Sequence, residues 1–553
     1  METRKTVERE EIIGAEDKLF NFRPLFFFAV FFMFGILFTV LRQSKNLSPW
    51  WLCLFILLFL PFVFCRSVVR AKRIFIGILS LFCAFALGIG AFLVQAENFQ
   101  SGGVYNGACA VQGRVVKRTE TNDSLCVTLD NLVIEGNEKK GKLVAYLPST
   151  YANAVTVCDE VLLLGALSTD TRVFVDGEVQ AYAVQDNRRY QMTADDCVVI
   201  GRKVNVFLLL RERIERAVYT GMDETPAAVT MAILTGDTDG IGNGLLQNIR
   251  YGGIAHIFAV SGLHIGALYA FCLWVINKTK GYRISKAVRF VLVAALLLFY
   301  GGVCGYSASV IRAVVMCLVL YASKLIGFGT DLSERLGLAA IIVLLLSPVS
   351  LFTIGFQLSF AACLGIAWLA PSIQKGCYAV GELFVREKDE EKEEDKKDGK
   401  PPTITQRVVK SVLSFFSVTV SAQLATAPLS YYAFGYLSGW ALLLNCLFVP
   451  VLSAAFSALL LFVVLACVLP LSASGIILCV PNAVWLLLLL VFEWFDFTSF
   501  ALTGITLGGG VVAAYYIALL FFTDKWNISK TTQRIIAISF TVLTLTALLL
   551  TNF

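Results

Sequence analysis

Long apolar stretches recur along the whole chain and alternate with short polar loops. The first three lie near residues 24–41, 50–65 and 74–95. Each is close to the roughly 20 residues that a helix needs to cross the hydrocarbon core of a bilayer. Lipid offers no hydrogen-bond partners, so a segment that crosses it alone must be helical. The pattern predicts a polytopic α-helical membrane protein whose first unit, residues 1–98, combines a cytoplasmic N-terminus with three transmembrane helices.

The pattern changes between residues 103 and 203, where short runs rich in valine and leucine are separated by turn-forming residues. Roughly five or six strands are predicted within about 100 residues, a density typical of a small closed barrel or sandwich. An oligonucleotide/oligosaccharide-binding (OB) barrel is one candidate. The predicted fold class is therefore a polytopic α-helical membrane protein with an all-β, OB-like domain.

Residues 204–222 are predicted to form an amphipathic helix. Apolar side chains recur at helical spacing, and charged residues fill the positions between them. The apolar positions are Phe207, Leu210, Ile214 and Val218. Such a helix beside a membrane domain is typical of the bilayer interface.

Two apolar blocks follow, residues 225–370 and 408–553, and they form the predicted membrane core. The segment between them, 371–407, contains a low-complexity run of acidic and basic residues at 386–400. Runs of this composition bury too little apolar surface to fold. We therefore predict a charged, disordered cytoplasmic loop over 371–407.

The composition supports a membrane protein, because 57% of the residues are hydrophobic and 16% are charged, against about 25% charged residues in soluble domains. The net charge of +6 is small for 553 residues and gives little support for a polyanionic ligand. Basic residues instead report topology, because short cytoplasmic loops carry an excess of lysine and arginine. Basic clusters without acids at 66–73 and 278–289 place both loops in the cytoplasm. The β-domain between them is then extracytoplasmic.

Two groups of residues in the β-domain are candidate contacts for a nucleic acid, because cations pair with phosphates and aromatic rings stack on bases. They are Arg114, Lys117 and Arg118, and Arg188, Arg189 and Tyr190. Residues 105–200 hold nine basic and thirteen acidic residues, however, whereas nucleic-acid-binding domains are usually basic. Ordinary surface charge therefore remains the alternative for both groups.

Four of the fifteen cysteines lie in the β-domain, namely Cys109, Cys126, Cys158 and Cys197. In an extracytoplasmic domain four cysteines can form up to two disulfides, with three connectivities. The sequence leaves the pairing open.

Both histidines of the chain lie in one apolar stretch. His256 and His264 are separated by Ser261-Gly262 and flanked by further glycines. Ionisable groups at membrane depth are costly and usually mark a functional site. Glycine and serine permit a helix break, which is tolerated where the backbone is buried in protein or lines a water-filled cavity. The pattern therefore indicates a substrate path; the alternative is a glycine-rich helix contact in which both histidines bond to backbone carbonyls.

Other polar side chains occur within the apolar stretches of the two membrane blocks. They are Asp237, Arg312, Gln357, Ser359, Gln423 and Asn445. One arginine with several amides and few carboxylates is unlike a proton relay, which uses chains of carboxylates and histidines. The set suits contacts with a phosphate backbone.

These segments resemble, in the same order, the motifs of ComEC-type competence proteins. The matching runs are Ile233-Leu-Thr-Gly-Asp237, Gly252 to Gly266, Arg312-Ala, Gly355-Phe-Gln-Leu-Ser-Phe360 and Ser421-Ala-Gln-Leu-Ala-Thr-Ala-Pro-Leu429. The resemblance covers about 225–460 and extends more loosely to the leading helices and the β-domain. It implies a channel in the bacterial cytoplasmic membrane through which single-stranded DNA enters the cell during natural transformation.

The resemblance also implies which residues act and which partners they meet. The residues implied to line the DNA path are Asp237, His256, Ser261, Gly262, His264, Arg312, Gln357, Ser359, Gln423 and Asn445. They would position the strand and neutralise part of its charge, without covalent chemistry and without a cofactor. The implied partners are single-stranded DNA, membrane lipids, a separate nuclease, a DNA receptor and a cytoplasmic helicase or ATPase.

Many members of that family carry a C-terminal metallo-β-lactamase-like domain, whose metal site needs several histidine and aspartate ligands. Both histidines of this chain already lie in the apolar stretch. We therefore expect no metallonuclease and no metal site in the chain, and a channel rather than an enzyme.

Two other hypotheses fit the same stretch. One is a small-solute transporter with a broken-helix site at the bilayer midplane. The other is an intramembrane hydrolase in which His256 or His264 activates Ser261. The sequence offers no nearby acid to orient such a histidine.

Overall fold

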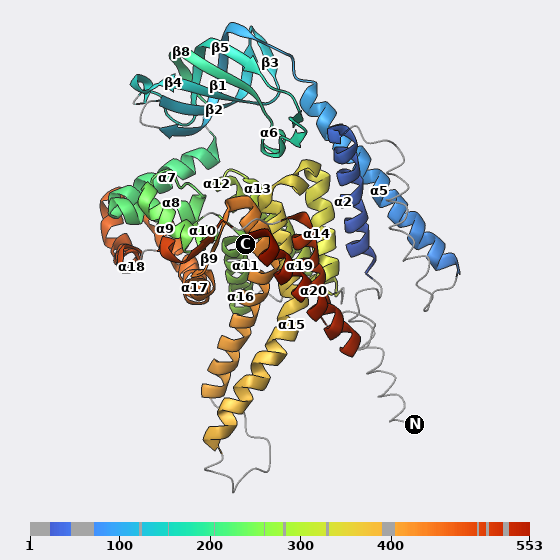
Figure 1. Cartoon of the computed structure of the whole chain (residues 1–553). Coiled ribbons are helices and arrows are strands. Elements are labelled where there is room, and N and C mark those ends of the chain that lie inside the picture. The colour runs from blue at the N-terminus through green and yellow to red at the C-terminus, as the bar shows by residue number, and fades with distance from the viewer. Residues whose placement is uncertain are drawn as a thin grey trace.

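The computed structural model describes residues 23–45, 71–120, 124–152, 154–203, 205–258, 260–279, 284–327, 331–389, 404–494, 497–504, 508–523 and 530–552. A β-barrel lies at one end of a helical bundle, and a pair of long helices projects from the other end (Figure 1). The predicted combination of a helical membrane domain with an N-terminal β-domain is confirmed.

Seven helices among the described residues are long and apolar enough to cross a membrane. They are α2 (Pro24–Lys45), α5 (Ala71–Gln100), α12 (Lys286–Val303), α13 (Ala308–Ile326), α15 (Ile354–Asp389), α16 (Ile404–Phe434) and α18 (Ser474–Trp494). An eighth span results if α17 (Ala441–Val468), bent by 41° just beyond Pro450, crosses as one unit. A proline inside a helix removes a hydrogen bond and kinks the helix. The chain is therefore a multi-pass membrane protein.

The predicted spans at 24–41 and 74–95 are confirmed by α2 and α5, whereas the span predicted at 50–65 lies outside the described residues. Further helices complete the bundle. They are α8 (Glu224–Thr235), α9 (Asn243–Tyr251), α10 (Ala255–Phe258), α11 (Gly262–Lys278), α14 (Leu332–Leu346), α19 (Gly509–Phe521) and the terminal α20 (Lys530–Asn552). Two short strands, β9 (Tyr436–Ser438) and β10 (Ala501–Thr503), pair antiparallel beside them.

Helices α2 and α5 cross at two glycines. A Cβ atom on Gly35 would lie 2.1 Å from the Phe85 carbonyl oxygen, and a Cβ on Gly88 would lie 2.2 Å from the Phe32 carbonyl oxygen. Helices in lipid associate through such small residues, which let the backbones approach closely. Both helices end at the barrel, because Ser44 donates to the Gly177 carbonyl and the Asn98 carbonyl accepts from Arg189.

We expect Gly88→Leu to separate α2 from α5, since the new side chain has no space at the crossing. The loss of stability should be about 1–3 kcal/mol, the usual effect of overpacking a tight contact. Thermal unfolding of the detergent-solubilised chain measures it. Gly77→Leu on the same helix is the matched control, because a Cβ at Gly77 meets nothing within 4 Å. Equal melting temperatures for the two variants would contradict the predicted contact.

The barrel closes through five strands. These are β1 (Gly107–Glu120), β2 (Ser124–Ile134), β4 (Lys142–Pro148), β5 (Asp159–Thr169) and β8 (Arg188–Arg202), with β3 (Asn137–Lys139) added beside β2. Neighbouring strands follow the circuit β1-β2-β4-β8-β5-β1, in which only the β4–β8 pair is parallel. Alternate side chains such as Leu125, Val127 and Leu129 are fully buried, as the period of a strand requires. Of the two predicted forms, a small closed barrel or a sandwich, the structure has the barrel.

An insertion between β5 and β8 joins the barrel to the membrane domain. It contains the hairpin β6 (Phe174–Val175) and β7 (Glu178–Val179), followed by α6 (Ala181–Gln185). Its buried residues Val173, Ala181 and Val184 belong to the same apolar cluster as residues of α2, α5 and α14. The barrel is therefore packed onto the bundle, as Figure 1 shows, and is not suspended on a linker.

The predicted amphipathic helix is α7 (Val206–Gly221), which lies between barrel and bundle (Figure 1). Phe207 fills the space beside Gly302, where a Cβ atom would lie 2.5 Å from the phenyl ring. Arg213 donates to the carbonyl oxygens of Cys467 and Leu469, each at 3.2 Å. These are carbonyls that the end of α17 leaves without helical partners. The helix thus packs along the edge of the membrane domain.

The prediction of a disordered loop over 371–407 is wrong for most of its length. Helix α15 continues to Asp389 and α16 begins at Ile404, and the two helices run side by side beyond the bundle (Figure 1). The two helices stay paired through polar contacts, which a hydropathy pattern does not reveal. Gln374 donates to Ser414 at 2.9 Å, and the Tyr378 hydroxyl donates to the Lys410 carbonyl at 3.4 Å. The remaining residues, 390–403, lie outside the described part.

Candidate functional site

The stretch with both histidines contains the predicted helix break. Helix α10 ends at Phe258 and α11 begins at Gly262. Ser261 is extended, with φ −123° and ψ 176°, and its hydroxyl accepts a hydrogen bond from the Leu263 N–H at 3.3 Å. The Ser261 N–H in turn donates to Nδ1 of His264 at 3.2 Å. This reciprocal arrangement is a capping box. It provides hydrogen-bond partners for backbone N–H groups at the start of a helix, which have none within the helix.

His264 is a positioning residue in this structure. Its side chain is 2% exposed, and its ring meets the Phe456 ring edge-on at a centroid distance of 4.8 Å. Because Nδ1 accepts from a backbone N–H, the ring proton resides on Nε2. The imidazole is enclosed and holds the helix break in place, and the predicted role of His264 in the path stays a prediction.

The same geometry disfavours the hydrolase hypothesis. The Ser261 hydroxyl lies 3.4 Å from Nδ1 of His264, but the backbone N–H of Ser261 is closer to that nitrogen. A nucleophilic serine also needs a third group that orients its base. Among the described residues, no carboxylate hydrogen-bonds to His264.

His256 has the opposite surroundings. It is exposed, unlike the enclosed His264. Gly262 is exposed as well, and Ser261 is half-buried, while the adjacent Ile257 and Phe258 are buried in the core. His256, Ser261 and Gly262 are therefore the residues of this stretch that can line a path.

The break is anchored to two further motif segments. A Cβ on Gly236, which ends α8 with φ +81°, would lie 3.4 Å from Val260. The Val260 carbonyl accepts from the Ser309 hydroxyl at 2.6 Å. The Leu234 carbonyl accepts from the Tyr300 hydroxyl at 2.8 Å. The structure thus brings together the end of α8, the helix break and the start of α13.

Arg312 lies one turn after Ser309 on α13 and is 7% exposed. Its guanidinium lies against Gly355 of α15, where a Cβ atom would come within 3.0 Å of a terminal nitrogen. Nε is buried without a hydrogen-bond partner, and no carboxylate among the described residues forms an ion pair with the side chain. Burying a cation without a counter-charge is costly. The site is therefore built to receive an anion or water at Arg312.

Gln423 and Asn445 also have buried polar atoms without hydrogen-bond partners. Oε1 of Gln423 on α16 and Oδ1 of Asn445 on α17 are buried without a partner. Nearly all buried polar atoms in proteins are hydrogen-bonded, and the exceptions call for water, an ion or a ligand. Gln357 is engaged instead, because its Nε2 donates to the Leu351 carbonyl at 3.1 Å. Ser359, one turn away from Gly355 on α15, is half-buried.

Asp237 lies at the edge of the site. Its carboxylate forms an ion pair with Arg211 of α7 at 2.5 Å. The next acid, Asp239, accepts from the Thr119 hydroxyl at 3.1 Å and lies 3.6 Å from the Lys117 ammonium. The loop after α8 therefore connects α7, the end of β1 and the helix break. That Asp237 also lines the path stays a prediction.

Most of the basic residues proposed for the barrel have structural partners. Arg114 forms an ion pair with Asp130 at 2.6 Å, and hydrogen bonding to that carboxylate raises the pKa of Arg114. Arg118 donates to the Ala152 carbonyl at 2.6 Å, and Arg188 pairs with Asp186 at 2.8 Å. Lys117 keeps an exposed ammonium. Ordinary structural charge is thus the better interpretation for Arg114, Arg118 and Arg188.

Arg189 and Tyr190 are buried rather than presented to a ligand. Arg189 is 8% exposed, donates to the Asn98 carbonyl at 2.8 Å and lies over the Phe99 ring. Tyr190 is 3% exposed within the barrel core. In this structure the Tyr190 ring therefore presents no face at the surface on which a base could stack.

The four cysteines of the barrel are free thiols, so neither of the two possible disulfides is formed in this structure. Cys158 and Cys197 are buried, and Cys109 and Cys126 are half-buried. Burial and the neighbouring Asp196 carboxylate raise the pKa of the Cys197 thiol to about 11.

We expect Cys197 to alkylate slowly at pH 8, because only the thiolate reacts and a raised pKa keeps the thiol protonated. The rate should rise about tenfold per pH unit up to about pH 11. Iodoacetamide labelling followed by peptide mass spectrometry measures it, with the urea-unfolded chain as the control, where an ordinary pKa near 8.5 applies. A disulfide-linked peptide containing Cys197 in unreduced protein would contradict the free thiols.

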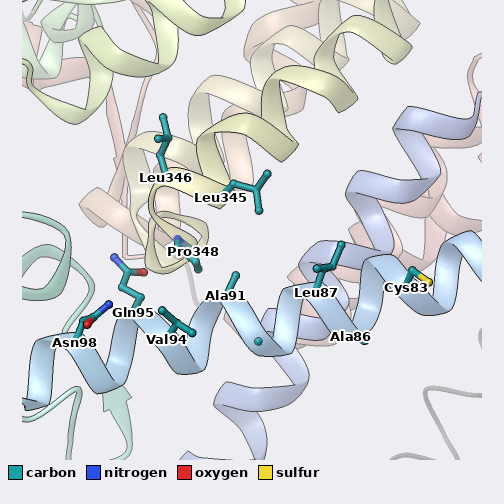
Figure 2. Close-up of a pocket in the computed structure, with 11 residues that line it drawn as sticks. Cys83, Ala86, Leu87, Ala91, Val94, Gln95, Asn98, Leu345, Leu346 and Pro348 are labelled. Carbon is teal, nitrogen blue, oxygen red and sulfur yellow. The ribbon is translucent and has the colours of Figure 1, made fainter.

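An apolar groove of about 820 Å³ lies elsewhere, between α5 and the end of α14 (Figure 2). Its wall includes Leu87 and Val94 of α5 and Leu346 of α14. Gln95 and Asn98 lie at one end of the groove. None of the motif residues lines it. The groove is therefore separate from the candidate site.

Sequence reasoning found the helix break and Arg312 but missed the residues that hold them. Ser309 and Tyr300 anchor the two loops through single hydroxyl-to-carbonyl bonds. The spacing of Ser309 and Arg312 on one helix was a usable signal, since residues three apart share a face. Nothing in the sequence near Tyr300 indicated its partner, which lies 66 positions away.

The fold and the site define a class: a multi-pass membrane protein whose interrupted helix and buried cation lie near a docked β-barrel. Comparison with protein families identifies it further. Residues 233–527, just over half of the chain, match the family described as "Competence protein". The chain belongs to the competence protein family.

The chain also matches individual relatives. The chain is 25% identical over 289 residues to ComE operon protein 3 of Bacillus subtilis (strain 168), covering 52% of this chain and 31% of that protein. It is 34% identical over 125 residues to the uncharacterized protein MG316 homolog of Mycoplasma pneumoniae, covering 22% of this chain and 30% of that protein. The matches thus span about a third of the length of these relatives. No solved structure matches the chain.

Proposed function

We propose that the chain conducts single-stranded DNA across the bacterial cytoplasmic membrane during natural transformation, as a channel without covalent chemistry. The observation that carries the proposal is Arg312, a buried cation without a carboxylate partner among the described residues. It lies beside the helix break of a chain that belongs to the competence protein family. A passing phosphate supplies the missing counter-charge, and arginine pairs with phosphate oxygens through two parallel hydrogen bonds.

The barrel is proposed to be an OB-like domain on the outer side. The circuit β1-β2-β4-β8-β5-β1 with one parallel pair supports a five-stranded Greek-key barrel, the OB architecture. The outer placement is supported by charge. The α12–α13 turn contacts α7 through Tyr306 and Phe207, whereas the opposite ends of these two helices carry Lys286 and Lys324. Basic residues favour the cytoplasmic side, which leaves the barrel outside.

The exposure of each residue determines the role that we assign to it in the site. His256, Ser261 and Gly262 would line the path, Arg312 with Gln423 and Asn445 would contact the backbone of the strand, and His264 would hold the break. The expected partners remain single-stranded DNA and membrane lipids, together with a separate nuclease, a DNA receptor and a cytoplasmic helicase or ATPase. All roles are positioning roles, so no cofactor enters the proposal.

The test is a transformation assay in a strain that lacks this gene, with DNA entry and DNA integration scored separately. The wild-type chain should restore nuclease-protected DNA in the cytoplasm. His256→Ala should restore protein in the membrane but not DNA entry, whereas Leu296→Ala, at an exposed apolar position on α12, should restore both. DNA entry at the wild-type level without the gene would refute the proposal.

A further inference from the structure

Helix α19 is the last described helix of the family-matched region 233–527, and none of the residues assigned to the path lies on it. Two consecutive tyrosines of α19 contact the backbone of α16. The Tyr515 hydroxyl donates to the Leu424 carbonyl at 2.7 Å, and the Tyr516 hydroxyl donates to the Ala425 carbonyl at 3.0 Å. Tyrosines of membrane proteins commonly direct the hydroxyl to the water interface. Here both hydroxyls instead bind one turn of a neighbouring helix.

The Leu424 carbonyl needs an outside donor because of Pro428. In an α-helix this carbonyl accepts from the N–H four residues later. Proline has no N–H, and its ring crowds that carbonyl, so Pro428 inside α16 leaves Leu424 without its helical partner. The turn lies within an apolar span, where lipid supplies no donor and a neighbouring helix must do so. Tyr515 is the donor that replaces the N–H missing at Pro428.

Side-chain hydroxyls also reach the two preceding carbonyls. The Thr426 hydroxyl donates to the Ala422 carbonyl at 2.9 Å and to the Gln423 carbonyl at 3.4 Å. Together with the two tyrosines, four consecutive carbonyls, those of residues 422–425, accept from side-chain hydroxyls. Hydroxyl bonds of this kind bend a helix. The course of this turn is therefore set by side chains, two of which belong to α19.

The same turn is packed tightly against α15. A Cβ atom on Gly365 would lie 2.4 Å from Cβ of Ala425 and 2.7 Å from the Ser421 carbonyl oxygen. Ser421 and Ala425 are four residues apart and share a helix face, whereas Gln423 between them lies on the opposite face. The turn is thus held by α15 through close packing and by α19 through hydrogen bonds. Both contacts determine where Gln423 points.

Gln423 depends on this support because its side-chain Oε1 is buried without a hydrogen-bond partner. A functional side chain is held in place by the contacts of the backbone that carries it. We propose that Tyr515, assisted by Tyr516, is a positioning residue of the candidate site, which holds the Gln423 turn by supplying the donor that Pro428 lacks. The assignment rests on the proposed function, in which Gln423 contacts the strand.

The first test is a double-mutant cycle on the thermal unfolding of the full chain in detergent. Tyr515→Phe removes only the hydroxyl and should lower the melting temperature by about 1–2 °C. In a Pro428→Ala chain, where residue 428 has its own N–H, the same change should leave the melting temperature unaltered. Tyr432→Phe on α16 is the matched control, because Tyr432 is 80% exposed. An equal loss from Tyr515→Phe in both backgrounds would overturn the proposal.

The second test is DNA entry, normalised to the amount of protein in the membrane. Tyr515→Phe should lower entry about tenfold, and Pro428→Ala in the same chain should restore it. Tyr516→Phe should have the smaller effect, because the Ala425 carbonyl still faces an N–H four residues later. A general folding defect would not be rescued by a change at Pro428.

Wild-type DNA entry by Tyr515→Phe would overturn the positioning role. Normal entry by Gln423→Ala, together with a defect in Tyr515→Phe, would overturn it as well, because the tyrosine would then act through another residue. Either result leaves the proposed function standing. That function fails separately, through DNA entry at the wild-type level in the strain without the gene.

Discussion

Arg312→Ala is expected to reduce DNA entry by on the order of a hundredfold or more, because truncating a buried charged contact costs about 2–5 kcal/mol. Arg312→Lys should retain part of the activity, since it keeps the charge and loses the planar fork that matches phosphate. Gly355→Ala should also lower DNA entry, because its Cβ atom would come within 3.0 Å of the guanidinium. The measurement is nuclease-protected DNA in cells, normalised to the amount of protein in the membrane.

The stability of Arg312→Ala separates a ligand-binding role from a structural one. A buried cation that lacks a counter-charge destabilises the resting protein, so its removal should leave the melting temperature unchanged or raise it. A paired structural arginine would give the opposite result. Lys324→Ala, at an exposed position near the other end of the same helix, is the control and should change neither property. A variant that is both inactive and clearly less stable would count against phosphate binding.

His264→Ala and His264→Gln are expected to differ sharply. Alanine removes the capping contact and leaves a space beside Phe456, with a loss of about 2 kcal/mol or more. Because the break carries Val260, whose carbonyl fixes Ser309 of α13, DNA entry should fall at least tenfold. Glutamine at this position can accept from the Ser261 N–H, as it does in ordinary capping boxes. It should therefore restore both stability and DNA entry.

The comparison of the two variants also tests for chemistry at His264. If the imidazole transferred protons, glutamine would be as inactive as alanine while the chain melted at the wild-type temperature. That result would revive the hydrolase hypothesis. Thermal unfolding and DNA entry measured on the same preparations give the answer.

The sequence predicted much of the fold because lipid and strand periodicity are strong constraints. Span length predicted α2 and α5, and the alternation of valine and leucine predicted the barrel. The helix break was predictable because Ser261-Gly262 interrupts an apolar run. The spacing of Ser261 and His264 was itself a capping signal, since an N-cap serine pairs with a side chain three positions later. The sequence prediction instead placed His264 in the path, and its structural role follows only from the contact of its Nδ1 with the Ser261 N–H.

Other features depended on register and tertiary contacts that a single sequence does not carry. Tyr190 and Met192 point into the barrel, and a shift of one residue would have reversed them. The helical course of 371–389 depends on Gln374 and Tyr378 meeting α16, so charge composition gave the wrong answer. Helix α6 lies in a turn-rich segment without periodicity, and only the contact of Gln185 with Ser350, 165 positions away, reveals its place.

The central claim is that the strand passes the helix break and Arg312. The most direct measurement is photocrosslinking. Cells are irradiated while they take up DNA that contains 4-thiothymidine, and the crosslinked peptides of the unaltered chain are mapped by mass spectrometry. Adducts are predicted on the peptide around His256 and on the start of α15 beside Arg312, and none on the exposed apolar face of α12. Crosslinks confined to the barrel, in cells where the DNA reaches the cytoplasm, would contradict passage through this site.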